Sequence, residues 1–135
     1  MSLVSGWSRK GNMPLKRLLS LAAIVEAVTG LVSLISPLLL TRLLFGAEVS
    51  GAGVAGGRIG GIALLGLAVA CWPGEASACA RSAAFRGMLT YSLLAALFLA
   101  YLGIRGSSPG LLLWPGAAFH GVFSVLLVVA WLKER

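Results

Sequence analysis

Two ionisable residues, Glu26 and His120, stand inside long apolar stretches and are the strongest candidates for chemistry. An ionisable side chain at membrane depth is costly and rarely occurs without a partner or a role. Each shares its helical face with small and polar residues: Ala22, Ala23, Thr29, Gly30 and Ser33 beside Glu26, and Gly116, Ala117, Gly121 and Ser124 beside His120. Such a carboxyl–imidazole site suits proton coupling, a quinone headgroup or a cationic ligand.

The same two residues also have a structural interpretation. A buried polar pair can simply hold two helices in register. On either interpretation we expect Glu26 and His120 to lie in contact, because their estimated depths in a bilayer differ by only about 5 Å. Arg58 becomes a third member if its side chain turns inward, and otherwise extends to the membrane interface.

Two further residues, Tyr91 and Ser124, complete the candidates for ligand or proton binding. Tyr91 begins a stripe with Leu94, Phe98 and Tyr101 at helical spacing, which is more typical of packing than of a ligand cage. No catalytic residue is predicted, because the chain has one histidine and no aspartate. With Cys71 and Cys79 spaced unlike a zinc or redox motif, no metal site is predicted.

The composition indicates a membrane protein. The chain has 135 residues, of which 59% are hydrophobic and 11% charged. Soluble proteins carry about 25% charged residues, so these are too few to cover a water-exposed surface. The formal charge of +7 comes from basic residues scattered between apolar runs, which suits lipid headgroups. No nucleic-acid motif is present, so nucleic acid is not an expected partner.

Four apolar runs are each long enough to cross a bilayer, which takes about 20 helical residues. The predicted spans are about 18–36, 53–72, 85–104 and 111–132. They predict an all-α integral membrane protein, a four-helix up-down bundle that forms one domain over residues 1–135. Residues 1–15 are expected to be a polar, basic lead-in, and turns are expected at Pro73–Glu75 and at 106–110.

Pro37–Phe45 follows the first span and has two interpretations. Ser36 and Pro37 are typical of a helix start, and Gly46 of a helix end, which predicts a short helix at the membrane interface. The alternative is a proline kink within one longer helix.

Glycines on the first two spans are predicted to serve packing. Gly30, Gly57 and Gly61 would let helix backbones approach closely in lipid. The run Gly51–Gly56 matches a dinucleotide-binding motif in letters, but that motif needs a βαβ unit, which this chain lacks.

The positive-inside rule predicts the orientation. Eight basic residues fall on one side of the predicted spans and three on the other. The eight are Arg9, Lys10, Lys16, Arg17, Arg81, Arg86, Lys133 and Arg135, and the three are Arg42, Arg58 and Arg105. Both termini are therefore expected in the cytoplasm.

The runs from Leu21 to Gly30 and from Arg58 to Gly66, with Pro37–Leu40 between them, resemble the DoxX-like family of small four-helix bacterial membrane proteins. This resemblance implies an accessory subunit of a quinol-oxidising complex in a bacterial inner membrane, with quinone as its possible cofactor. The first span, with its single glutamate, is also similar to the small multidrug exporters, although the third span lacks their expected aromatic and glycine signature.

Two functions follow as expectations. The first is an accessory or interaction subunit of a membrane complex, which could be redox-active and quinone-linked, with other subunits or further copies of the chain as partners. The alternative is a proton-coupled transporter of small molecules that works as a dimer, with Glu26 as the proton carrier. An enzyme with its active site inside the bundle has the weakest support.

Overall fold

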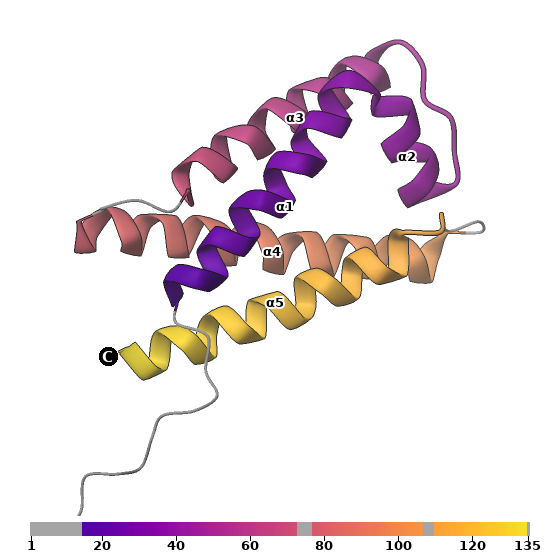
Figure 1. The fold of residues 1–135 in the computed structure, drawn as a ribbon. Helices are drawn as coiled ribbons and strands as arrows, with labels where there is room; N and C mark the ends of the chain where they lie inside the picture. Colours follow the sequence, from indigo (N-terminus) through magenta and orange to yellow (C-terminus); the bar gives the residue numbers. More distant parts are fainter. Residues whose placement is uncertain (1–14, 73–76, 107–109, 135) are drawn as a thin grey trace, which may run out of the picture.

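Every element in the computed structural model is a helix within residues 15–72, 77–106 and 110–134, which are the residues described (Figure 1). The helices are α1 (Leu15–Ile35), α2 (Pro37–Phe45), α3 (Ala52–Ala70), α4 (Ala78–Arg105) and α5 (Leu113–Glu134). All except α2 are long and apolar enough to cross a membrane. The prediction of an all-α bundle with four candidate spans is thereby confirmed, and the chain has the fold of a multi-pass membrane protein.

Apolar side chains cover the outside of the bundle. On α1, exposed residues recur every three or four positions: Leu21, Ile24, Val28, Leu31 and Ile35. A stripe of this kind is unfavourable in water, but it is the normal surface of a helix that faces lipid.

The helices associate as two antiparallel pairs. α1 packs mainly on α3, and α4 packs mainly on α5, with few contacts between the pairs. The pairs converge where α1 begins and α5 ends, and diverge toward α2 (Figure 1). At the converging end Leu18 and Met88 are buried in an apolar core, and the Phe85 and Trp131 rings stack at 5.4 Å.

The α1–α3 contact is close because small residues line it. A Cβ added at Gly30 would lie 2.8 Å from the carbonyl oxygen of Gly61, so the two backbones nearly touch. One turn further, the Ser33 hydroxyl donates a 2.7 Å hydrogen bond to the carbonyl oxygen of Gly57. A Cβ at Gly57 would lie 2.8 Å from Cβ of Pro37, which brings the start of α2 against α3.

The chain between α1 and α3 forms a separate short helix. Ser36 leaves the helical conformation (φ −135°, ψ 71°), and Gly46 ends α2 in the left-handed region (φ 65°). The Ser36 side chain makes no capping hydrogen bond, so Pro37, at the first position of α2, is the residue that favours a helix start here. α2 also contacts the chain just before α5. There the amide of Leu112 donates a 2.8 Å hydrogen bond to the carbonyl oxygen of Leu43.

The helix bounds differ from the predicted spans mainly at α4. This helix begins at Ala78, seven residues before the expected start at 85. The Ser77 hydroxyl accepts a hydrogen bond from the amide of Ala80 and caps the first turn of α4, which Arg81 and Arg86 separate from the apolar run that follows. The lead-in over residues 1–14, the turn at Pro73–Glu75 and residues 107–109 lie outside the described residues.

Candidate functional site

Glu26 lies in the interior of the bundle. It stands midway along α1, and 2% of its surface is exposed. Tyr91, on α4, makes a side-chain hydrogen bond with it, in which the phenol donates to the carboxyl group. Among the described residues no ion pair reaches Glu26. The carboxyl group is thus held by a neutral donor from the opposite helix pair.

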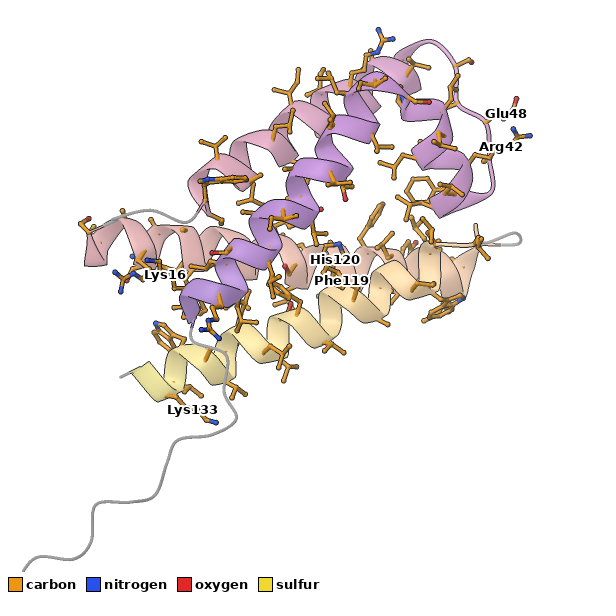
Figure 2. The ribbon with its side chains drawn as sticks, in the orientation of Figure 1. Lys16, Arg42, Glu48, Phe119, His120 and Lys133 are labelled. Carbon is orange, nitrogen blue, oxygen red and sulfur yellow. The ribbon has the colours of Figure 1, made fainter. Side chains whose placement is uncertain are left out.

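His120, on α5, lies against the same tyrosine. The Tyr91 and His120 rings meet edge to face, with centroids 5.4 Å apart and planes at 89°. Phe119 contacts His120 at the same centroid distance and stacks on Phe123 at 5.8 Å. Figure 2 places His120 and Phe119 near the middle of the α4–α5 pair. Nδ1 of His120 is buried and finds no hydrogen-bond partner in the described part of the chain.

Three of the five residues predicted to bind a ligand or a proton, Glu26, Tyr91 and His120, therefore lie together in the structure. Which of them contact one another differs from the prediction. Tyr91 contacts both Glu26 and His120, and no hydrogen bond or ion pair joins those two directly. The long phenol reaches from α4 to the carboxyl group on α1 and takes the position that we expected the imidazole to occupy.

Arg58 does not join this cluster. Its side chain is exposed on α3, next to Gly57, whose carbonyl oxygen bonds Ser33. Ser33 lies seven residues beyond Glu26, which is about 10 Å along the helix axis. An exposed arginine near one end of a span agrees with the interpretation that it extends to the interface.

Ser124 is buried beside His120, but its hydroxyl is already bonded. It donates to the carbonyl oxygen of His120, one turn earlier in the same helix, at 2.8 Å. Ser124 thus has no donor free for a ligand.

Sequence reasoning missed Ser92, which is fully buried and whose hydroxyl has no partner among the described residues. Two contacts between α4 and α5 show which residue of α5 lies opposite Ser92. Leu99 lies beside Gly116, and Phe85 stacks on Trp131. This register puts Ser92 opposite Ser124. Its place on the face that carries Phe85 and Met88 is visible in the sequence, but its missing partner is not.

The site combines a carboxyl group, a phenol, an imidazole with one unpartnered nitrogen, and aromatic rings. These groups could bond a polar headgroup and exchange a proton with it. No three histidine, cysteine, aspartate or glutamate side chains gather to hold a metal ion within the described residues. Comparison of the chain with protein-family models, curated proteins and solved structures gave no match.

Proposed function

We propose that the chain is an accessory subunit of a redox complex in the bacterial inner membrane, and that it binds a quinone at Glu26, Tyr91 and His120. The observation that carries this proposal is the buried, unpartnered Nδ1 of His120 beside the hydrogen-bonded Glu26–Tyr91 pair. A buried polar atom without a partner costs free energy, and a ligand that bonds it recovers that cost.

The chemistry of a quinone fits these groups. Its two carbonyl oxygens accept hydrogen bonds, which an imidazole N–H can donate. Its flat ring packs well against aromatic side chains such as Phe119 and Tyr91. When a quinol is oxidised it loses two electrons and two protons. In this proposal a partner subunit takes both electrons, the Glu26 carboxylate accepts one proton, and the unpartnered Nδ1 of His120 accepts the other.

The proposed orientation, with both termini in the cytoplasm, rests on the distribution of basic residues. Lys16 and Lys133 lie at the end of the bundle where α1 begins and α5 ends, whereas Arg42 lies at the α2 end (Figure 2). Lysine and arginine are enriched on the cytoplasmic side of membrane proteins.

The test is the quinone and polypeptide content of the protein after purification from its own membrane in mild detergent. We expect a near-stoichiometric quinone and at least one co-purifying polypeptide. His120→Phe should lose most of the quinone, whereas Tyr101→Phe, on the exposed face of α4, should retain it. A wild-type protein without quinone, or a His120→Phe variant with undiminished quinone, would contradict the proposal.

One observation favours the alternative, a dimeric proton-coupled transporter. The two helix pairs share few contacts, and Glu26 and Tyr91 bond across them, so protonation of Glu26 could change how the pairs pack. Glu26→Gln separates the two functions. Loss of pH-dependent substrate efflux in vesicles would support the transporter. Unchanged efflux together with loss of co-purifying subunits would support the accessory subunit.

A further inference from the structure

The short helix α2 covers one side of the bundle and leaves another uncovered by it. α2 lies close to α1, α3 and α5, whereas no Cα atom of α2 comes within 8 Å of one in α4. α3 and α4 contact each other near Leu67 and Gly87, where a Cβ added at Gly87 would lie 3.8 Å from Cδ1 of Leu67. From this point toward α2, α3 and α4 diverge (Figure 1).

The residues beyond this contact have open space beside them. A Cβ added at Gly56 or Gly60 would meet no atom within 4 Å, whereas one at Gly61 would strike the backbone of α1. On α4, Leu94 and Phe98 are 59% and 58% exposed. The side between α3 and α4 is therefore apolar, and a glycine leaves room there.

The diverging part of α3 and α4 begins near the level of the candidate site. Gly30 lies opposite Gly61, so Glu26, four residues earlier in α1, stands level with Leu65 of the antiparallel α3. Gly60 is five residues from Leu65, or about 7.5 Å along the axis toward α2. Leu94 and Phe98 follow Tyr91 by three and seven residues, which places all three on one side of α4.

We propose that the isoprenoid tail of the bound quinone passes between α3 and α4, over Gly60, while its headgroup lies at Tyr91 and His120. This inference rests on the proposed function, because it takes the quinone as the ligand. The headgroup alone would fill only the polar centre of the bundle. A long hydrocarbon tail attached to it must reach lipid, and α2 covers the other side of the bundle, between α1 and α5.

Gly60→Leu tests this route. Leucine should fit at Gly60 without disturbing the fold, because nothing lies within 4 Å, and should occupy the space of the tail. We expect it to weaken the binding of ubiquinone-2, which has two isoprene units, at least tenfold and to leave the binding of tailless ubiquinone-0 unchanged. Gly66→Leu is the matched control, since Gly66 is equally open but lies on another face of α3. It should change neither affinity.

The outcomes separate the route from the proposed function. If wild-type protein binds neither quinone, the proposed function fails and the route fails with it. If wild-type protein binds both, and Gly60→Leu behaves like Gly66→Leu, the route alone is overturned. A ubiquinone that carries a photoreactive group on its tail gives a second measurement. Labelling of α3 and α4 supports the route, and labelling of α1 and α5 overturns it.

Discussion

A Cβ on Gly61 would lie 2.7 Å from the carbonyl oxygen of Gly30 and 2.8 Å from the backbone nitrogen of Leu34. Both of these atoms belong to the backbone of α1, which cannot move aside as a flexible side chain can. The distance between α1 and α3 is therefore set by a glycine on each helix, and the position of Glu26 relative to the other helix pair depends on it.

Gly61→Ala should accordingly destabilise the protein. Overpacking of this kind costs about 1–3 kcal/mol. Unfolding in detergent, followed by circular dichroism against added denaturing detergent, measures the loss. Gly66→Ala is the matched control, because its new methyl group meets nothing within 4 Å. Equal stabilities for the two variants would show that α1 and α3 are not packed as described.

The Tyr91–Glu26 hydrogen bond gives a second prediction. Tyr91→Phe removes the donor and leaves a buried carboxyl group unsatisfied, which should cost about 1–3 kcal/mol in unfolding free energy. Tyr101→Phe removes a phenol that is exposed and paired only with Arg105 on the surface, so it should change stability little. If both variants unfold alike, the carboxyl group does not depend on Tyr91.

Ser33 provides a prediction about the α1–α3 contact. Ser33→Ala removes the 2.7 Å bond to the carbonyl oxygen of Gly57 on the neighbouring helix. Such interhelical bonds average about 0.6 kcal/mol, so we expect a small but measurable loss of stability in the same unfolding experiment. Ser20→Ala, whose hydroxyl bonds only the Lys16 carbonyl oxygen of its own helix, should lose less. The reverse order would contradict the packing.

The proposed orientation can be tested with reporter fusions at the C-terminus. A green fluorescent protein fused there should fluoresce, because it folds in the cytoplasm, and alkaline phosphatase fused there should be inactive. The opposite result would place the C-terminus outside and would overturn the inference from the basic residues.

The sequence predicts the helices well because bilayer thickness and hydropathy set their lengths. It does less well at Ala78, because the first turns of α4, which carry Arg81 and Arg86, lie outside the apolar run but inside the helix. A separate helix at Pro37 was one of two predicted alternatives. The non-helical backbone of Ser36 in the structure distinguishes it from a proline kink within one longer helix.

The site was harder to predict, because a sequence pattern gives the face of each helix but not how the helices rotate against one another. Glu26 was predicted to be important because placing a carboxyl group inside a membrane costs free energy, and it is indeed buried in the bundle. Its bond to Tyr91 was not predicted, since an aromatic stripe is typical of simple packing. The unpartnered hydroxyl of Ser92 also depends on three-dimensional placement.

The presence of a single histidine allows a direct test of the central claim that His120 binds a quinone headgroup. Protein labelled with ¹⁵N-histidine should give the resonances of one imidazole, free of overlap. On addition of ubiquinone-2 we predict that the Nδ1 resonance shifts as this atom gains its bond. An Nδ1 resonance that does not move at saturating ubiquinone-2 would contradict the claim.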